Sequence, residues 1–319
     1  MSSATPPWQP TASIQALHQR AALLADIRRF FAERSVLEAE VPTLSHRATS
    51  DPHIDSITAL CTGEPVYLAT SPEFGLKRLL AAGFGDCYYL GKAFREGEAG
   101  GRHNPEFTML EWYRVGWDDR RLMEEVGELL SQVLGIGNIR SLSYRELFQH
   151  HLQLDPHRAS DEELQECARR EVELSFVPAS RDECLDLLMS HRLEPAMGDG
   201  ITLLHDFPAS QAALARVETD ETGTPVARRF EAYVAGLELA NGYWELTDAQ
   251  EQQRRFEADH RYRAMQKLHV YPFEERLVAA LEAGMPECAG VALGVDRLLM
   301  LAGGYQRIEE VIAFPIERA

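Results

Sequence analysis

Cations, an aromatic ring and a carboxylate gather within residues 94–114 of this 319-residue chain. Side chains that suit phosphate groups stand there at Arg95, Arg102 and His103. Phe107 offers a flat ring on which a base can lie, and the carboxylate of Glu111 can pair with an amine. The segment therefore holds groups for phosphate, base and ammonium, although a half-buried hairpin with a solvated, charged loop would contain the same residues.

Two antiparallel strands are expected to position these groups. Residues 87–95 (CYYLGKAFR) and 106–114 (EFTMLEWYR) are rich in aromatic and β-favouring types, and three glycines with an Asn-Pro pair lie between them. Side chains on a strand alternate between its two faces. One face would therefore carry Phe107, Met109, Glu111 and Tyr113.

A second polar strand is expected over residues 234–249, VAGLELANGYWELTDA. Asn241, Tyr243 and Glu245 alternate and would share a face, whereas Glu238 would point away on a regular strand. A β-bulge at the Asn-Gly pair, residues 241–242, would bring both carboxylates to one side. Two carboxylates beside a phosphate-binding arginine suit Mg²⁺, although a solvated strand edge is an equal alternative.

The segment CAGVALGVDRLLMLAGG, residues 288–304, predicts an apolar strand, a turn at Gly294 and a helix that opens with Asp296 and Arg297. The N-terminus of a helix favours anions, and Arg297 adds a full positive charge there. The alternative is a structural ion pair of Arg297 with Asp296 or Glu282.

The N-terminal region predicts a helix and a short strand. A Pro/Ser/Thr-rich tail, residues 1–12, precedes a helix that Ser13 can cap. Apolar residues recur in that helix at three- and four-residue steps and are expected to form its buried stripe, at Ile14, Leu17, Ala21, Leu24, Ile27 and Phe31. Residues 36–41 (VLEAEV) then predict a strand that Pro42 ends.

Further elements follow along the chain. Residues 66–70 predict a strand that leads into Ser71, Pro72 and Glu73, and Ser71 and Glu73 suit the start of the helix expected over residues 74–82. The remaining expectations are an amphipathic helix over 118–134, a helical insertion over 141–200 and a solvent-facing helix over 248–267.

Composition argues against several classes of protein. The net charge of −18 disfavours a protein that grips nucleic acid through its phosphates. No apolar run approaches the roughly 18 residues of a membrane span, and the first residues lack the features of a signal peptide, so a cytoplasmic location is expected. The five cysteines are far apart without a CxxC pair, which predicts reduced structural thiols and no zinc site.

Three segments, in the same order, resemble the signature motifs of class II aminoacyl-tRNA synthetases. FR…RHNPEFTMLEWY is similar to the second motif in its lysine-specific form, the helix, strand and Pro42 to the first, and GVALGVDRLLML to the third. The resemblance covers about residues 14–319. It implies an α+β fold with an antiparallel sheet flanked by helices, in one catalytic domain (residues 13–319) that carries the 141–200 insertion and forms a homodimer.

Within that family, the segments LEWYR, ELANGYWELTDA and VALGVDRL resemble those of a stand-alone branch. The enzymes of this branch activate β-lysine with ATP and transfer it to a lysine side chain of elongation factor P. Lysyl-tRNA synthetases carry an N-terminal anticodon-binding barrel, and no room for one is expected ahead of a core that begins near residue 14, so tRNA is not the expected acceptor. The open alternatives are activation of lysine for another acceptor and a non-catalytic regulator of synthetase type.

The resemblance also implies roles for individual residues. Arg95, Arg297 and Glu238 would be catalytic, with the α-phosphate of ATP at Arg95, the γ-phosphate at Arg297 and Mg²⁺ near Glu238. The full nucleotide set it implies is Arg95, Glu98, His103, Asn104, Phe107, Glu238, Leu239, Gly294 and Arg297, with Glu238 and Glu245 as candidate metal ligands. The amino-acid set is Ser71, Pro72, Glu73, Glu111, Tyr113, Asn241, Tyr243, Glu245 and Ala292.

Within the amino-acid set, the side-chain ammonium would meet Glu245 and Tyr113, and the other amine Glu73 or Glu111. Ala292 stands where lysyl-tRNA synthetases typically have glycine (GVALGVDR here, GLGIGIDR there), and its methyl group is expected to crowd the α-amino group of lysine. This chain also reads FREG at residues 94–97 where the lysine branch usually reads FRNE, so Glu96 or Glu98 would replace the missing glutamate.

Overall fold

Residues 6, 8–173 and 176–319 are described by a computed structural model of this protein. The chain divides into two compact units, the first formed by Met1–Gly116, Thr247–Cys288 and Ala292–Ala319, and the second by Trp117–Leu246 and Ala289–Val291. The predicted tail lies mostly outside the described residues, and the single catalytic domain with an insertion stays a prediction. Among the described helices, none combines the length and apolar character that a membrane crossing needs.

The first unit contains the predicted hairpin, formed by β5 (Cys87–Phe94) and β6 (Glu106–Val115). The two strands pair antiparallel, and β1 (Leu37–Glu38) lies parallel to β5 on its other side. In the register Tyr89 faces Glu111 and Cys87 faces Tyr113, so the side chains expected on one face of β6 do share it. The predicted strand over residues 36–41 is real but is only two residues long.

Helix α1 (Ile14–Glu33) covers the opposite face of this hairpin, and the side chain of Ser13 caps it as predicted. Phe31 stacks on Tyr88 with 4.5 Å between ring centroids and meets Trp112 edge-on at 5.3 Å. The predicted buried stripe was wrong in part, because Ile14 is 61% exposed and Ala21 lies on the outer side. The residues buried in α1 are Ala16, Leu23, Ile27, Phe30 and Phe31.

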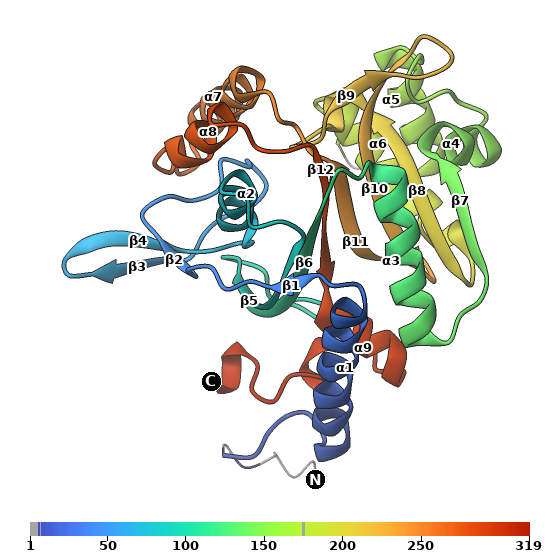
Figure 1. The fold of residues 1–319 in the computed structure, drawn as a ribbon. Helices are drawn as coiled ribbons and strands as arrows, with labels where there is room; N and C mark the ends of the chain where they lie inside the picture. The colour runs from blue at the N-terminus through green and yellow to red at the C-terminus, as the bar shows by residue number, and fades with distance from the viewer. Residues whose placement is uncertain (1–5, 7, 174–175) are drawn as a thin grey trace. The chain divides into compact units, whose positions relative to one another are not determined.

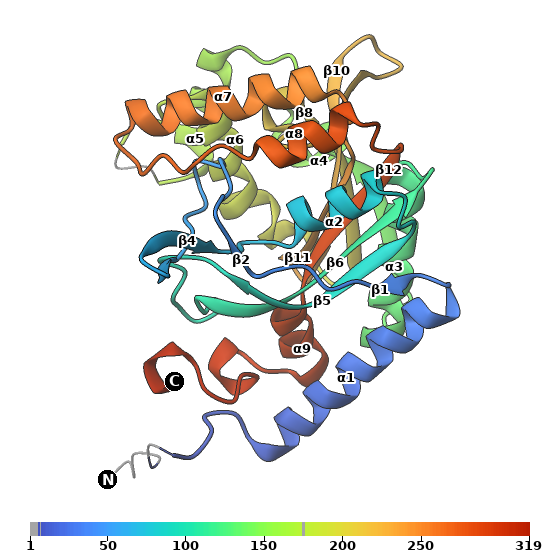
Figure 2. The same cartoon turned by 60° about the vertical axis from the view of Figure 1, so that its left-hand side comes forward.

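A small sheet and three helices also belong to the first unit. The sheet has the order β2 (Leu44–Ser45), β4 (Glu64–Leu68), β3 (Thr58–Cys61). Helix α2 (Glu73–Ala81) packs against α8 (Glu275–Glu282), which runs beside α7 (Ala249–Met265), as Figure 2 shows. The expectation of a purely solvent-facing α7 was wrong at Arg263, which is fully buried and bonds to Asp55 and to backbone oxygens.

The predicted strand and helix near the C-terminus are β12 (Cys288–Gly294) and α9 (Val295–Gly303). Asp296 at the start of α9 is buried and accepts hydrogen bonds from Arg20 at 2.6 Å and from the backbone N–H of Thr108 at 2.7 Å. These bonds fix the first turn of α9 against both α1 and β6. Two short helical turns follow, η4 (Ile308–Glu310) and η5 (Ile316–Arg318).

The second unit holds a sheet with the strand order β11 (Leu237–Trp244), β10 (Pro225–Val234), β8 (Ile201–Pro208), β7 (Ile139–Ser143), and β9 (Val217–Thr219) pairs with β10. The expected single strand over residues 234–249 was wrong in its first part. Ala235 and Gly236 both have positive φ, 50° and 72°, and form the tight turn of a β10–β11 hairpin.

Helices cover both faces of this sheet. Leu203 in β8 lies beside Gly127 of α3 (Asp119–Leu134), while its neighbour Leu204 points the other way. On that second face, α4 (Tyr144–Leu152), α5 (Asp161–Glu171) and α6 (Arg181–Leu188) gather beside β8, as Figure 1 shows, followed by the turns η1 (Met189–Leu193) and η2 (Pro195–Met197) and, after β8, η3 (Ala209–Gln211). The helical character predicted for residues 141–200 is confirmed.

Candidate active site

Arg95 follows the end of β5 and lies beside the ring expected to hold a base. Its guanidinium carbon is 5.1 Å from the centroid of Phe107, and its Nη1 donates to Glu98 at 3.3 Å. Its Nε is buried without a hydrogen-bond partner among the described residues. A buried, unsatisfied guanidinium donor next to an aromatic face fits the phosphate and base of a nucleotide.

The loop after Arg95 decides which glutamate stands near it. Gly97 has φ +76°, a left-handed conformation that glycine adopts without strain, and the loop turns there. This turn places Glu98 beside Arg95, whereas Glu96 is exposed and its backbone N–H bonds to Asp55. The structure thus favours Glu98 over Glu96 as the replacement for the glutamate that FRNE would supply.

Arg297, the other predicted phosphate-binding arginine of the first unit, lies beside His103. Arg297 Nη2 lies 2.6 Å from His103 Nε2. Burial lowers the pKa of His103, and the charge of Arg297 lowers it further, so the imidazole is neutral and can accept the guanidinium hydrogen bond. Asp296, the alternative partner considered for Arg297, bonds instead to Arg20 and Thr108.

Two other residues of the nucleotide set hold the backbone around these cations. Asn104 is 5% exposed, donates to the carbonyl oxygen of Glu106 at 2.6 Å and accepts from the N–H of Ile316 at 3.1 Å. Gly294 is the N-cap residue of α9, and a methyl group there would reach only ordinary contact, 3.8 Å, with Arg297. Their observed contacts are structural, and their role toward a nucleotide stays a prediction.

A cluster of acids and hydroxyl groups lies on the Glu111 face of β6. Glu111 is 3% exposed and accepts hydrogen bonds from Ser71 Oγ at 2.7 Å and from the Tyr113 hydroxyl at 2.9 Å. Ser71 Oγ also accepts from the N–H of Glu73 at 2.9 Å, so it orders the start of α2 as expected. Pro72 is the N-cap residue of that helix. The structure therefore brings Ser71, Glu73, Glu111 and Tyr113 together.

Lys77 belongs to the same cluster and was missed by the sequence analysis. Its Nζ lies 2.6 Å from Glu73 Oε1, one helical turn away, and its side chain is 1% exposed. The hydrogen bonds to Glu111 and its burial shift the pKa of its carboxyl group in opposite directions. Burial and, after it, the charge of Glu73 raise the pKa of Glu111 to about 8, although the hydrogen bonds from Ser71 and Tyr113 and the charge of Lys77 act to lower it.

A polar face runs along the β10–β11 hairpin of the second unit. Glu231 faces Asn241, and Arg229 faces Tyr243, but the register then shifts so that Tyr233 faces Glu238. Leu239 is the extra residue, which places the bulge two residues before the predicted Asn-Gly position. Paired residues share a face, so Glu238 joins Asn241 and Tyr243 on one side. That Glu245 shares this side with Glu238 stays a prediction, because Glu245 lies beyond the end of β11.

Sequence analysis missed the β10 half of this face. Glu231 accepts hydrogen bonds from Arg229 and from the hydroxyl of Tyr233, and Arg229 Nε donates to Asn241 at 3.2 Å. The charges of Glu231, Tyr243 and Glu238 all act on Arg229, against its burial, and its pKa is raised. The alternation of RRFEAY, residues 228–233, was the signal that could have revealed these residues.

Glu245 lies just past β11 and is 1% exposed, and its backbone bridges to Ala215. Leu239, the bulge residue, is buried at 3%. Ala292 is half-buried near the end of β12. The described residues include no group of three or more His, Cys, Asp and Glu side chains arranged for a metal ion. The carboxylates of Glu231 and Glu238 on one face nevertheless have the donor chemistry that Mg²⁺ accepts.

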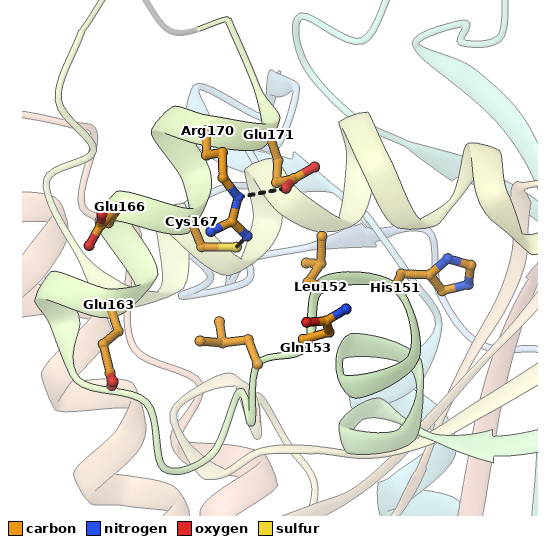
Figure 3. A pocket seen from close by; sticks show the side chains of 9 residues that line it. His151, Leu152, Gln153, Glu163, Glu166, Cys167, Arg170 and Glu171 are labelled. Carbon is orange, nitrogen blue, oxygen red and sulfur yellow. Dashed lines mark hydrogen bonds and ion pairs between the residues drawn. The ribbon is translucent and has the colours of Figure 1, made fainter.

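A cavity of about 480 Å³ lies at helices α4 and α5, and none of the predicted site residues lines it (Figure 3). Arg170 is one of the residues that line the cavity. It donates a hydrogen bond to Glu171 at 2.9 Å and lies 3.6 Å from Cys167 Sγ (Figure 3). The cavity is lined by His151, Leu152, Gln153, Leu154, Glu163, Glu166, Cys167, Arg170 and Glu171.

An antiparallel-rich sheet with an arginine-bearing hairpin and a second arginine at the start of a C-terminal helix is the architecture of class II synthetases. The chain belongs to that family: residues 9–318 match the tRNA synthetases class II (D, K and N). The chain is also 49% identical over 327 residues to proteins named "Elongation factor P--(R)-beta-lysine ligase" from Salmonella paratyphi B and Salmonella typhimurium, with 99% of this chain and 100% of each relative covered.

Proposed function

We propose that this protein activates (R)-β-lysine with ATP and transfers it to a lysine side chain of elongation factor P. The observation that carries the proposal is the 49% identity to ligases of that name over their whole length. The buried cluster around Glu111 supports it, because acids and hydroxyl groups there suit a substrate with amino groups.

ATP is held by the first unit in this proposal. Phe107 supports the adenine, Arg95 takes the α-phosphate through the donor that is otherwise unsatisfied, and Arg297 takes the γ-phosphate. Glu98 and His103 orient the two arginines through the contacts described above. Asn104 and Gly294 complete the part of the proposed nucleotide set that the first unit carries.

Mg²⁺ would be held by Glu238, and Glu231 is the second carboxylate that its face offers. The ion would supply positive charge for the departing pyrophosphate. We assign Glu245, the other candidate metal ligand, to the amino acid instead. It lies beyond the end of β11 and outside the pairs that place Glu231 and Glu238 on one face of the hairpin.

Selection of the amino acid is assigned to the two acidic clusters and to β12. Glu245 and Tyr113 receive the side-chain ammonium, and Glu73 or Glu111 receives the other amine. Ser71 and Pro72 shape the start of α2 beneath Glu73. The remaining proposed contacts come from Asn241, Tyr243 and Ala292.

The chemistry requires no protein nucleophile. The carboxylate of β-lysine attacks the α-phosphorus, the bond to the β-phosphate oxygen breaks, and pyrophosphate leaves. The neutral amine of the acceptor lysine then attacks the acyl carbon, AMP leaves with the electron pair of the acyl–oxygen bond, and the amine loses a proton as the amide forms. Alignment of reactants and neutralisation of phosphate charge by Arg95 and Arg297 supply the rate.

The partners follow from the same proposal. Elongation factor P is the acceptor, and tRNA is not, which agrees with the net charge of −18. A homodimer is proposed from the first class II motif, and Ile14 in α1 and Leu37 in β1 are 61% and 56% exposed there. A modifier of a translation factor belongs in the cytoplasm.

The test is the intact mass of elongation factor P after incubation with this protein, ATP and either (R)-β-lysine or lysine. A gain of one β-lysyl residue, lost when the acceptor lysine is replaced by arginine, is the expected result. A gain with lysine alone would support the lysine-activating alternative. No gain together with no ATP–pyrophosphate exchange would support the non-catalytic one.

A further inference from the structure

Two carboxylates and one ammonium group meet in the cluster of the first unit. Glu73 and Lys77 pair at 2.6 Å within α2, and the Lys77 side chain is 1% exposed. Glu111 on β6 is 3% exposed, and its hydrogen bonds within the described chain come from the neutral hydroxyl groups of Ser71 and Tyr113. If both acids were ionised, these three groups would carry one net negative charge in a buried place, which is costly.

We propose that Lys77 is a positioning residue for amino-acid selection: by holding Glu73, it makes Glu111 the acid that keeps a proton until a diamino substrate replaces that proton with an ammonium group. The inference rests on the proposed function, because it needs a substrate with a second amine. On binding, the Glu111 carboxyl loses its proton to the solvent and the resulting carboxylate pairs with the substrate ammonium. Total charge in the cluster then balances without any protein rearrangement.

The groups that face Glu111 from every neighbouring element agree with this exchange. Glu73 and Lys77 reach it from α2, Tyr113 from its own strand, and Cys87 and Tyr89 from β5. Burial raises the pKa of Cys87 to about 12 and raises that of Tyr89 as well, with Glu111 adding to both shifts. Both β5 groups are therefore neutral at physiological pH, and Lys77 is the cation among these neighbours.

The exchange makes the cluster a filter for charge. A substrate that carries an ammonium group ionises Glu111 and gains a buried ion pair. An analogue with a hydroxyl or methyl group at that position leaves Glu111 protonated and gains only a neutral hydrogen bond or none. Discrimination against such an analogue should therefore strengthen as the pH rises toward 8, because binding of the ammonium substrate releases a proton whereas binding of the analogue releases none.

The first measurement needs no substrate. In protein labelled with ¹³C at glutamate carboxyl carbons, the Glu111 signal, assigned by its loss in Glu111→Gln, should titrate with a midpoint between pH 7 and 9. Addition of (R)-β-lysine at pH 7 should move this signal to its ionised position. A midpoint in the ordinary glutamate range, near pH 4 to 5, would overturn the inference whatever the substrate proves to be.

The second measurement counts protons. Calorimetry of (R)-β-lysine binding at pH 7, in buffers of different ionisation enthalpy, should give release of about one proton per site, falling toward zero at pH 9. Binding heat that does not depend on the buffer would overturn the inference while leaving the proposed function intact. No binding of either (R)-β-lysine or lysine would count against the proposed function, and the ¹³C titration still decides the state of Glu111.

Lys77→Met tests the positioning role, with Lys92→Met as the matched control. Lys92 forms an exposed pair with Glu106 at 3.2 Å, so its loss should change neither KM nor proton count. Lys77→Met should raise KM for (R)-β-lysine about tenfold or more while leaving kcat and KM for ATP within about twofold, because the ion pair that positions Glu73 is lost. An unchanged KM for (R)-β-lysine in a folded Lys77→Met protein would contradict the positioning role.

Discussion

Glu231 and Glu238 lie on the same face of the β10–β11 hairpin because Leu239 is an extra residue in β11. Without that residue the alternation of the strand would point Glu238 to the other face. The bulge thus creates a pair of carboxylates from two positions, seven residues apart in sequence, that a regular hairpin would separate.

A first prediction concerns this pair. Glu231→Gln and Glu238→Gln should each raise the Mg²⁺ concentration for half-maximal ATP–pyrophosphate exchange by about tenfold or more, since each removes a charged oxygen donor. The measurement is exchange against Mg²⁺ at saturating ATP. Glu221→Gln, in the exposed turn before β10, is the control and should leave the Mg²⁺ requirement unchanged. The assignment fails if both variants keep the parental requirement.

A second prediction concerns Glu245, which is 1% exposed. Glu245→Gln should abolish activation of the amino acid while leaving ATP binding nearly intact. A buried ammonium without its charged partner costs about 3–5 kcal/mol, which lowers exchange by about a hundredfold or more. Exchange at saturating ATP and calorimetry of ATP binding measure the two effects separately. Parental exchange by the variant would remove Glu245 from the list of amine ligands.

A third prediction concerns Ala292, half-buried on β12. Its methyl group should crowd the α-amino group of lysine, whereas β-lysine carries that amine one carbon further along. Ala292→Gly should therefore raise kcat/KM for lysine relative to β-lysine by about 10- to 200-fold, the usual worth of one methyl group in a pocket, without changing KM for ATP. A change in the ratio of less than about threefold would show that Ala292 only fills space, and the preference would then be built by Ser71, Glu73 or Glu111.

A fourth prediction is a pH dependence of stability. The pKa of Glu111 is raised to about 8 in the folded protein, so between its ordinary value and 8 the folded state holds one proton more than the unfolded chain. The free energy of unfolding must then fall as the pH rises through this window. Denaturant unfolding of the parent and of Glu111→Gln from pH 5 to 8.5 isolates the term, because all other groups are shared.

In that comparison the parent should lose stability relative to Glu111→Gln by an amount on the order of a few kcal/mol between pH 5 and 8. A difference that stays constant with pH would mean that Glu111 ionises normally. A difference of the opposite sign would mean that a cation holds its carboxylate in the folded protein.

Local sequence patterns were sufficient for the elements that carry the arginines. Alternation in β6 and the strand–Gly294–helix order of β12 and α9 are signals contained within about ten residues each, and both predictions are confirmed. The predicted buried stripe of α1 was only half right. The three- and four-residue spacing of apolar residues fits two neighbouring faces of the helix equally well, and Ile27 and Phe31 belong to both faces. Packing against Tyr88 and Trp112 decides between them, and that packing is not a local property.

The residues that were missed depend on pairing between distant segments. Lys77 has the spacing of an ordinary helix residue, and its role emerges only when α2 packs on β6 and brings Glu73 near Glu111. Glu231 was overlooked because its neighbours are set by the β10–β11 register, which the bulge at Leu239 shifts. Sequence reasoning foresaw that a bulge was needed but not which residue formed it.

The bonds of Asp296 have a consequence for the time at which this protein becomes active during synthesis and folding. Its partner Thr108 is 188 positions away in the chain, and its partner Arg20 is 276 positions away. Loops of that length must close before either bond exists, and contacts between distant segments form slowly. Since α9 also carries Arg297, a nascent chain should acquire this proposed nucleotide-binding arginine only after α9 has left the ribosome, and refolding should restore ATP binding only in its slowest phase.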